Sequence, residues 1–552
     1  MRGVSLTLSE SVPQPGREPA MPPEPPKSQE PEGTAETGET RETEENGEDR
    51  ENRKDRKDRK DREDREDREN GENGENGENE QNGIRAGRSG WPRPPAAICA
   101  RRLDPYVLAV LLFGAYATVS VARFQNLATM SWDLGIFEQA IRAYAHLRAP
   151  VADLKGPGTN ILGDHFSPVT ALLAPVYRVF PSPITLLVAQ AALFALSAVP
   201  VTRVAARSLG RAGGLAVGVA YGLSWGIQRA VNFDFHEIAF AVPLIAFSLE
   251  ALLTRRWRAA LLWAVPLIFV KEDLGLTAAA IAVVVALRAR RASPRTAVVA
   301  LVVATLLAVA ALLTFTVVIP AFNTGDTYDY WDKVNNEYGP LDGAGVKIRT
   351  LLWLLLPTTG LLALRSPLLL VALPTLGWRF LSGEPHYWGT DWHYSAVLMP
   401  VVTLALVDTL ERARRSPRPW LRAYAHRLPA AVASAALALT TSLPLAVLTE
   451  PAAYRTNPRA TAVEEMLRRI PDGATVEAGI VPGSRLTSRC RVFWLGDTEG
   501  RNPDHIALRS TNDRDPVVYA RQLHPRATYS LTAETGGYAL LTRVSPPPGE
   551  GG

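Results

Sequence analysis

The chain has 552 residues, of which 46% are hydrophobic and 21% charged, and its formal net charge is +4. Apolar runs of roughly 16 to 25 residues recur between Leu103 and Thr449, each long enough to cross or nearly cross a bilayer, so a purely soluble protein is excluded. Two cysteines, Cys99 and Cys490, are too few for the disulfide framework of a small secreted protein.

Residues 1–100 are predicted to form a disordered, charged cytoplasmic tail. They hold 25 acidic and 17 basic residues, so the tail carries a net charge of −8 and the remainder of the chain +12. The repeat "RKDRKDRKDREDREDRENGENGENGEN" has a triplet period that does not match the 3.6-residue turn of a helix, and it lacks apolar residues. Because a phosphate-binding arm would be uniformly basic, this mixed-sign charge argues against nucleic-acid binding.

Residues 101–449 are predicted to form a multi-pass transmembrane domain. The apolar runs predict about eleven spans, and the fold class is therefore an all-α polytopic membrane protein. The spans lie near 104–122, 183–204, 213–230, 238–254, 258–270, 274–289, 296–319, 348–364, 366–381, 393–410 and 428–449.

Arginines cluster in alternate connections between these spans. Arg101 and Arg102 precede the first span, and further clusters lie at 203–211, 255–258, 288–295 and 412–422. The positive-inside rule places all of them on the cytoplasmic side together with the tail, and an odd number of spans then places residues 450–552 outside. The opposite connections hold nearly all the remaining acids and histidines, which predicts one polar extracytoplasmic site assembled from several loops.

The long first outer loop, residues 123–182, contains the sequence "SWDLGIFEQA" (131–140). Its apolar residues fall mainly on one helical face, which is typical of a helix lying in the membrane interface. Asp133 stands at the start of this helix, where it is either an N-cap or a residue of the site. Trp132 is either an interfacial anchor or a substrate-binding residue.

The same loop continues with "GDHFSPVTALLAPVYRVF" (163–180). Ser167 and Pro168 already supply an N-cap and a first helical position, so Asp164 and His165 are not needed for capping. An Asp-His pair at a membrane surface suits proton transfer, phosphate binding or metal ligation. The alternative is a solvated pair of loop residues.

Two short polar clusters interrupt later hydrophobic segments. They are Asp234, His236 and Glu237 in "VNFDFHEIAF", and Lys271, Glu272 and Asp273 in "FVKEDLGL". Ionisable residues at membrane depth are costly and usually functional, so both clusters are predicted to bind substrate. The alternatives are ordinary surface charge for the first cluster and a helix cap for Asp273.

The segment "GEPHYWGTDWHY" (383–394) combines two histidines and two acids with aromatic neighbours. The candidate binding residues are Glu384, His386, Asp391 and His393. Aromatic rings beside acids suit carbohydrate, although an aromatic membrane belt explains the rings equally well. The same two interpretations apply to "TYDYWDKVNNEYG" (327–339). The acids and histidines could hold a divalent cation, but no spacing demands one, and no zinc motif, P-loop or nucleophile elbow is apparent.

Residues 450–552 are predicted to form a small extracytoplasmic α/β domain. "ATAVEEMLRRIPDGATVEAGI" predicts a helix, a Pro-Asp-Gly turn and a strand, and "RVFWL", "HIALR" and "GGYALLTRV" predict further short strands. Cys490, the one cysteine of this region, is interpreted as a buried residue.

Several of these motifs, in this order, resemble a bacterial family of polytopic membrane proteins known as domain of unknown function 2079. The motifs are "WDLGIFEQA", "GDHFSPVTALLAPVY", "FDFHEIAFAVPL", "KEDLGL" and "IVPGSRLTSR". The resemblance extends from about residue 104 to about residue 510 and excludes the tail. After the proline of the last motif a His-Leu-Ser-like sequence is expected, whereas this chain has Gly483-Ser484-Arg485-Leu486, so no role is assigned to it.

The layout is also similar to that of the GT-C class of membrane glycosyltransferases, which use polyprenyl-phosphate-linked sugars. This resemblance implies that Asp133 is the general base for an acceptor hydroxyl, with Asp164 and His165 as further catalytic residues. Lys271 or His165 would stabilise the departing lipid phosphate. The implied partners are the lipid bilayer and a lipid-linked sugar, and a divalent cation is one candidate cofactor.

Two other functions compete with sugar transfer. A transporter or flippase for a lipid-linked or polar substrate would carry ionisable groups within its spans, and Lys271, Glu272 and Asp273 favour this alternative most. A non-catalytic scaffold that displays the C-terminal domain is the third function, and it predicts that the outer-loop acids are dispensable.

Overall fold

The computed structural model describes residues 95–544 apart from residues 130, 326, 332–338, 340, 456 and 511–514, with side chains from residue 103 onward. The predicted charged tail therefore lies almost entirely outside the described residues. Two of the acids that the sequence placed in the later outer loops, Asp326 and Asp332, lie outside them as well.

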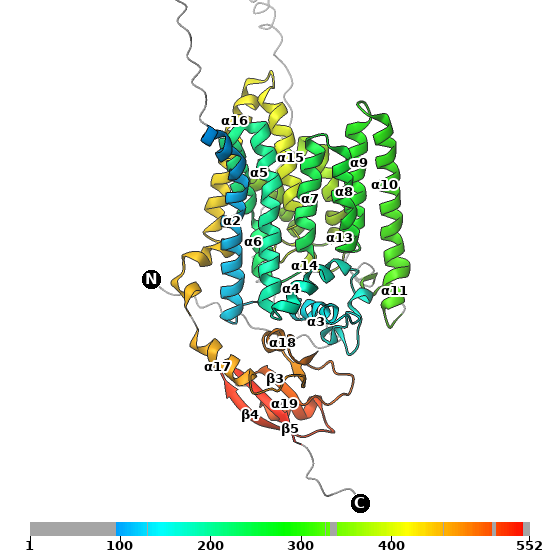
Figure 1. Ribbon diagram of the computed structural model, residues 1–552, viewed down its shortest axis with the longest axis vertical. Coiled ribbons are helices and arrows are strands. Elements are labelled where there is room, and N and C mark those ends of the chain that lie inside the picture. Colours follow the sequence, from blue (N-terminus) through cyan, green and yellow to red (C-terminus); the bar gives the residue numbers. More distant parts are fainter. Residues whose placement is uncertain are drawn as a thin grey trace, which may run out of the picture. The chain divides into compact units, whose positions relative to one another are not determined.

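Helices make up most of the described chain before residue 450, and those outside the first loop form a bundle (Figure 1). They are α2 (Pro95–Gln125), α5 (Pro183–Gly222), α6 (Trp225–Phe233), α7 (Ile238–Leu253), α8 (Trp257–Ala264), α9 (Leu274–Ala289), α10 (Pro294–Leu313), α11 (Ile319–Phe322), α12 (Ala344–Thr359), α13 (Leu373–Leu381), α15 (Leu398–Arg414) and α16 (Pro419–Thr440). Within the described residues, three stretches are long and apolar enough to cross a membrane: Leu103–Gln125, Pro183–Phe233 and Pro294–Phe322. Four shorter apolar stretches accompany them, so the number of about eleven spans stays a prediction.

The two spans predicted at 183–204 and 213–230 meet at one residue. Gly210 interrupts α5 with a non-helical backbone, φ 82° and ψ 172°. A residue with a Cβ rarely adopts this conformation, so glycine allows the chain to kink there without a separate loop.

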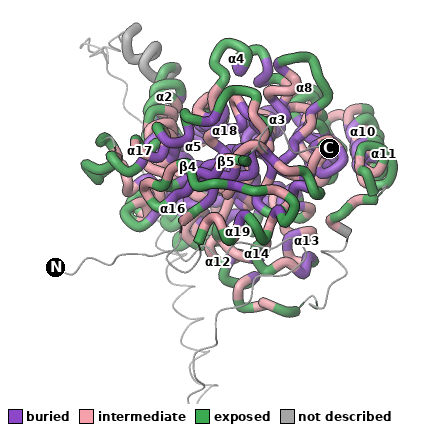
Figure 2. Tube along the Cα trace, turned by 90° about the horizontal axis from the view of Figure 1, so that it is seen from below, coloured by how far each residue is buried: buried purple, intermediate pink, exposed green. Residues whose placement is uncertain are grey.

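Apolar side chains on α2 and α10 point away from the protein core. Val110 and Leu111 of α2 and Val298, Leu306 and Leu312 of α10 are between 59% and 68% exposed. Figure 2 shows both helices at the rim of the bundle. Such a surface is unfavourable in water and stable against lipid chains, which agrees with a membrane protein.

One end of the bundle is held by arginine ion pairs, and we call it the arginine end. Glu250, near the end of α7, is fully buried and accepts from Arg203 (Nε–Oε1 2.6 Å) and Arg207 (Nη1–Oε1 3.2 Å). The carboxylate of Asp408 pairs with Arg288 at 2.5 Å and Arg412 at 2.7 Å. These acids lie among the arginine clusters that the positive-inside rule assigned to one side.

The first loop packs against protein on two sides. It contains α3 (Leu134–Ala145), η1 (Asp153–Lys155), η2 (Ile161–Gly163), η3 (Pro168–Leu173) and α4 (Ala174–Val179). Phe137 and Ile141 of α3 belong to the bundle core and Ile136 packs against the C-terminal core, so α3 is covered by protein on both sides, and its location in the membrane interface stays a prediction. The loop also has exposed apolar side chains on η3 and α4, where Leu172 and Val179 are 68% and 67% exposed, and Leu147 after α3 is 96% exposed.

The C-terminal region contains a five-stranded sheet. Its elements are α17 (Pro458–Leu467), β1 (Thr475–Ala478), α18 (Ile480–Leu486), β2 (Arg491–Trp494), β3 (His505–Arg509), α19 (Pro516–Leu523), β4 (Tyr529–Thr535) and β5 (Tyr538–Arg543). The strand order is β2-β1-β3-β5-β4, with β1 parallel to β2 and β3 and the remaining pairs antiparallel. The predicted small sheet at this end of the chain is confirmed, whereas α19 and β4 were not predicted. Cys490 is buried, as expected.

Candidate active site

A cavity of about 450 Å³ lies at the end of the bundle opposite the arginine end, where the loops before α3, α7 and α9 meet the segment 382–397. We call it the main cavity. It is lined by Asp133, Ile136, Phe137, Lys155, Ile161, Asp164, His165, His236, Lys271, Glu272, Asp273, Leu276, Phe315, Tyr328, Tyr330, Trp378, Ser382, Tyr387, His393 and Tyr394. Residues from five separate sequence segments thus come together, including all three predicted catalytic residues.

Asp133 occupies the N-cap position of α3, but its side chain makes no cap hydrogen bond. The Asp234 carboxylate takes that role, since its Oδ2 accepts from the backbone N–H groups of Asp133 at 3.0 Å and Leu134 at 3.3 Å. The alternative that Asp133 is only a cap is therefore wrong. Its carboxylate, with 28% of the side chain exposed, lines the main cavity and lies 3.8 Å from His236 Nε2.

Burial raises the pKa of Asp133, and the adjacent His236 opposes this rise without cancelling it. A carboxyl group with a raised pKa is a stronger base once ionised than a solvated aspartate. Asp133 therefore combines access to a ligand with increased basicity.

Two strained loop residues stand beside residues of the main cavity. Ser131 has a φ of 58° two positions before Asp133, and Trp392 has a φ of 65° directly before His393. The left-handed conformation costs about 1 kcal/mol or more for a residue that is not glycine, and it persists only where surrounding contacts impose it. Contacts with the rest of the fold therefore fix the backbone next to Asp133 and His393 in a conformation that these loop residues would not adopt by themselves.

Asp164 and His165 each have a partner from elsewhere in the fold. Asp164 pairs with Lys155 (Oδ1–Nζ 3.0 Å), and although burial acts to raise its pKa, the lysine holds the pKa below the ordinary value. His165 Nδ1 lies 2.8 Å from Glu272 Oε1, while no hydrogen bond from the described residues involves Nε2. Glu272 thereby fixes the ring and leaves the second nitrogen available to a ligand.

The buried carboxylate of Glu272 accepts hydrogen bonds from several donors of the described chain. Besides His165, its Oε1 accepts from the Tyr328 hydroxyl at 2.9 Å, and its Oε2 accepts from the Phe166 N–H at 3.1 Å. A carboxylate so fully occupied orients its neighbours and has little capacity left for a substrate.

Lys271 remains cationic although it is largely buried. Its Nζ lies 3.3 Å from Glu237 Oε1, and nearby carboxylates raise its pKa against the opposing effect of burial. Glu237 is fully buried and also lies 2.6 Å from His236 Nδ1, so this one carboxylate positions both a lysine and a histidine of the main cavity.

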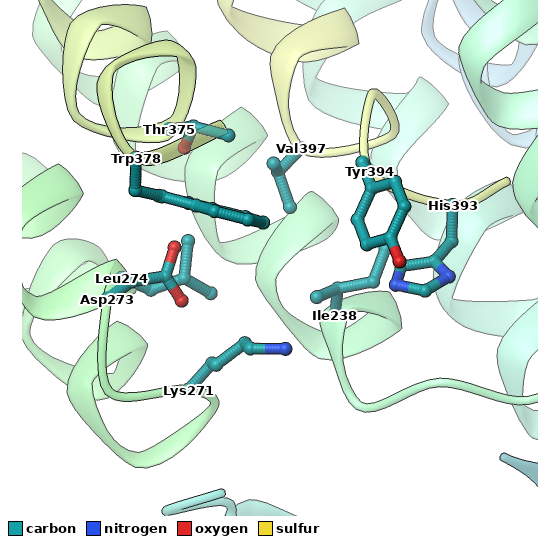
Figure 3. A pocket seen from close by; sticks show the side chains of 9 residues that line it. All are labelled: Ile238, Lys271, Asp273, Leu274, Thr375, Trp378, His393, Tyr394 and Val397. Carbon is teal, nitrogen blue, oxygen red and sulfur yellow. The ribbon is translucent and has the colours of Figure 1, made fainter. Parts of the chain in front are cut away.

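A second, smaller cavity of about 20 Å³ adjoins the main one (Figure 3). Lys271, Asp273 and Trp378 stand on one side of it, opposite His393 and Tyr394. Asp273 lies at the N-cap of α9 without a cap hydrogen bond, and its Oδ1 has no hydrogen-bond partner among the described residues. Burial raises the pKa of Asp273 to about 6.

One group of residues has the composition of a metal site. Ligand atoms of Asp133, His236 and His393 lie within 4.8 Å of one another, and the imidazoles of the two histidines stack at 3.7 Å. The buried Nδ1 of His393 has no hydrogen-bond partner in the described part of the chain. One carboxylate with two neutral imidazoles fits a zinc-like cation, so these residues could hold one.

The remaining predicted binding residues lie outside the main cavity. Trp132 stacks on Trp494 of the C-terminal region at 6.0 Å, and Asp234 and Glu237 lie behind the cavity wall. Glu384 and His386 pair with each other at 2.5 Å, and the 62% exposed side chain of Asp391 lies 3.5 Å from Arg229. None of these residues lines the main cavity.

Sequence reasoning missed Lys155 and Arg379. Lys155 has no charged sequence neighbour closer than Asp153 and reaches Asp164 only through the folded loop. The fully buried Arg379 donates to the carbonyl oxygens of Tyr387 (2.8 Å) and Gly389 (2.7 Å) and to Ser395 Oγ (3.1 Å), and so holds the segment that carries His393. An arginine within an apolar segment was the available signal for Arg379.

Comparison with known proteins gives a match to a family model and matches to solved structures. The family model described as "Predicted membrane protein (DUF2079)" matches residues 123–542. Comparison with curated proteins gives no match. The crystal structure of ArnT from Cupriavidus metallidurans bound to undecaprenyl phosphate aligns with a TM-score of 0.50 and 14% identity, covering 79% of this chain and 98% of ArnT. Its apo-state structure aligns with a TM-score of 0.44 and 12% identity, covering 78% and 97%.

Proposed function

The chain belongs to the DUF2079 family of predicted membrane proteins, and from this premise we propose that it is a GT-C-like glycosyltransferase that uses a polyprenyl-phosphate sugar. The main cavity supports this proposal most directly. It combines a carboxylate of raised basicity, Asp133, with two lysines and a histidine within one partly enclosed space. A base and a phosphate-binding group are the two requirements of such a transfer.

In the proposed reaction the acceptor hydroxyl attacks the anomeric carbon of the donor sugar. The bond between that carbon and the phosphate oxygen breaks, a new carbon–oxygen bond to the acceptor forms, and polyprenyl phosphate leaves. Asp133 takes the hydroxyl proton, so the products are the glycosylated acceptor, polyprenyl phosphate and one proton. The raised pKa of Asp133 suits this role, because a general base works best when its pKa lies near the pH at which the enzyme operates.

Cations of the main cavity would stabilise the departing phosphate. Lys271 keeps its charge despite burial, and His165 offers Nε2 from a ring that Glu272 holds in place. Lys155 adds a second ammonium group on the wall formed by the first loop. Fixed positive charge in a site of low dielectric stabilises a developing anion without reorganisation of solvent.

The aromatic lining would bind the sugar. Tyr328, Tyr330, Trp378, Tyr387 and Tyr394 line the main cavity, and their faces suit the apolar faces of a sugar ring. If Asp133, His236 and His393 hold a divalent cation, that cation would supply further positive charge for the phosphate. The donor itself is inferred from the fold, since ArnT, which shares it, was crystallised with undecaprenyl phosphate.

The proposal includes a membrane orientation. The tail and the arginine end would lie in the cytoplasm, with about eleven spans, while the main cavity and residues 450–552 lie on the outer face. Single cysteines introduced at Ser293 and Thr532 of a variant without native cysteines should react with an impermeant thiol reagent from the cytoplasmic and the outer side respectively.

Replacement of the proposed base is the primary test. Asp133→Asn should reduce transfer of label from an undecaprenyl-phosphate sugar to membrane acceptors at least 10²-fold, because the amide cannot take the proton. Asp391→Asn is the matched control, since this acid is exposed and lies outside the main cavity. Correct membrane insertion with full transfer in Asp133→Asn would overturn the assignment.

A transporter or flippase is the second candidate, favoured by the buried Lys271–Glu237 pair at the cavity wall. Reconstituted vesicles separate the two functions. Uptake or flipping of a lipid-linked sugar that is lost in Lys271→Met and retained in Asp133→Asn would favour transport over transfer.

A further inference from the structure

A second large cleft lies away from the main cavity, between the first loop and the C-terminal region. Its volume is about 630 Å³, and we call it the arginine cleft. Arg142 and His146 come from α3 and its C-cap, Arg148 and Asp153 from the loop that follows, and Arg491 from the start of β2. The predicted site residues include none of these.

The walls of the arginine cleft are fixed to each other by buried contacts. Gln139, only 7% exposed, donates to the carbonyl oxygen of Val492 at 2.8 Å and accepts from the Leu154 N–H at 3.1 Å. Gly135 permits the close approach of α3, because a Cβ there would lie 2.8 Å from Leu154 Cδ1 and 3.3 Å from Thr487 Cγ2. These contacts hold the two walls of the arginine cleft at a fixed separation.

Positive charge in the arginine cleft exceeds what its acid can balance. Arg491 forms a bidentate pair with Asp153 (Nε–Oδ2 2.9 Å, Nη2–Oδ1 2.8 Å), which uses the acid completely. Arg142 and Arg148 form no ion pair within 4.0 Å among the described residues, although the buried Glu138, one turn before Arg142 on α3, interacts with Arg142 electrostatically. His146 also lines the cleft, with its Nδ1 2.8 Å from the carbonyl oxygen of Arg142.

Arg142 presents its guanidinium in a form suited to an anion. Its Nη1 donates to the carbonyl oxygens of Thr487 (3.0 Å) and Cys490 (2.8 Å), which fixes the group without neutralising it. In the described part of the chain no hydrogen bond involves its Nε and Nη2, the parallel donor pair that binds a carboxylate or phosphate in bidentate fashion. The exposed Arg148, which also belongs to the first loop, lines the same cleft.

Helix α3 contributes residues to both the main cavity and the arginine cleft. Asp133 stands at the start of α3 and Arg142 nine residues later, a separation of about 14 Å along the helix axis. An extended acceptor could therefore place a hydroxyl at Asp133 and a negatively charged group in the cleft.

We propose that the arginine cleft binds an anionic group, phosphate or carboxylate, of the glycosyl acceptor. This inference rests on the proposed transfer function, since it assigns the acceptor to the class of extended, negatively charged molecules. It also gives the C-terminal region a role in substrate binding, because Arg491 and the carbonyl groups that hold Arg142 all belong to that region.

Anion binding to the full-length protein tests the proposal directly. The protein is placed in neutral phosphatidylcholine nanodiscs and titrated with inorganic phosphate and, separately, with glucuronate, and binding is followed by the NMR line width of each probe. Arg148→Gln changes an exposed side chain and should fold normally, and we expect it to weaken binding of at least one probe about tenfold. Arg142→Lys keeps the charge but loses the bidentate fork, and we expect a similar loss.

Matched controls separate this cleft from general charge effects. Arg290→Gln removes an exposed arginine at the arginine end and should leave binding unchanged. Equal binding in the wild type and in Arg148→Gln, or an equal loss in Arg290→Gln, would overturn the proposal. The preferred probe identifies whether the acceptor carries phosphate or carboxylate.

Asp133→Asn distinguishes failure of this proposal from failure of the transfer function. It should bind the anion normally while losing transfer. If transfer depends on Asp133 but Arg148→Gln binds the anion as the wild type does, the proposed anion site is rejected and the proposed transfer function stands. In the transfer assay, Arg148→Gln should raise the KM for the acceptor and leave kcat unchanged.

Discussion

The arginine end and the main cavity both bury charged side chains, but they satisfy them differently. At the arginine end Glu250 has two arginine donors, and Asp408 accepts from Arg288, Arg412 and the Ser366 hydroxyl. Around the main cavity Asp273 Oδ1 and His393 Nδ1 are buried with no hydrogen-bond partner among the described residues. Buried polar groups are normally paired, so the unpaired atoms indicate groups that await a ligand, whereas the paired ones hold helices together.

The largest effect should come from neutralising the Lys271–Glu237 pair. Lys271→Met combined with Glu237→Gln removes both charges of the pair, so neither member is left as an unpaired ion, and the glutamine keeps an acceptor oxygen beside His236 Nδ1. We expect transfer to fall about 10²- to 10³-fold, the cost of losing one positioned charge at a developing anion, while the thermal midpoint changes little. Full transfer in this double variant would show that the charges of the cavity are structural, like those of the arginine end.

At the arginine end the opposite result is expected. Glu250→Ala leaves Arg203 and Arg207 without their shared acid, so the free energy of unfolding should fall by about 3–5 kcal/mol. Chemical denaturation in detergent measures this loss, and transfer per folded molecule should stay at the wild-type level. If Glu250→Ala kept its stability but lost transfer, the charges of the arginine end would be functional and would not differ in role from those of the main cavity.

Glu138 tests the contact between α3 and the C-terminal region through pH. This buried carboxyl accepts from the hydroxyls of Tyr177 and Thr487, and burial raises its pKa to about 7 from an ordinary value near 4.5. The folded state holds this proton more tightly than the unfolded state does. Protonated Glu138 therefore adds to the free energy of unfolding below pH 4.5, and this stabilisation, on the order of 3 kcal/mol, is lost as the pH rises to 7.

The measurement is the thermal midpoint between pH 4.5 and 8. The wild type should lose stability across this range, and Glu138→Gln, which keeps an acceptor oxygen without the titration, should lose less. Parallel pH profiles for the two proteins would mean that Glu138 does not titrate in this range.

The smallest effect concerns the strained residue before Asp133. Ser131→Gly relieves a φ of 58° and should raise the free energy of unfolding by up to about 1 kcal/mol. Because the loop also becomes more flexible next to the proposed base, transfer should decrease even as stability rises. Leu147→Gly relieves a similar φ of 56° on the exposed surface, and it should stabilise the protein without any change in transfer.

The sequence by itself determined the features that depend on local composition. Apolar runs predicted the helices, the arginine clusters predicted the partition of charge between the two ends, and short apolar runs after residue 450 predicted β1, β2, β3 and β5. The motifs also marked most residues of the main cavity, among them Asp133, His165 and Lys271. These signals are readable because hydrophobicity and loop polarity act within a few residues.

Only the tertiary structure decided which charged group does what. Asp133 and Asp234 are both acids beside a helix start, and their roles separate because Asp234 reaches the first turn of α3 from a hundred residues away. The burial of α3, the pairing of Lys155 with Asp164 and the hold of Arg379 on the segment 382–397 depend likewise on long-range contacts. The physical reason is that hydrogen bonds and ion pairs form between neighbours in space, and sequence spacing does not encode which distant side chains become neighbours.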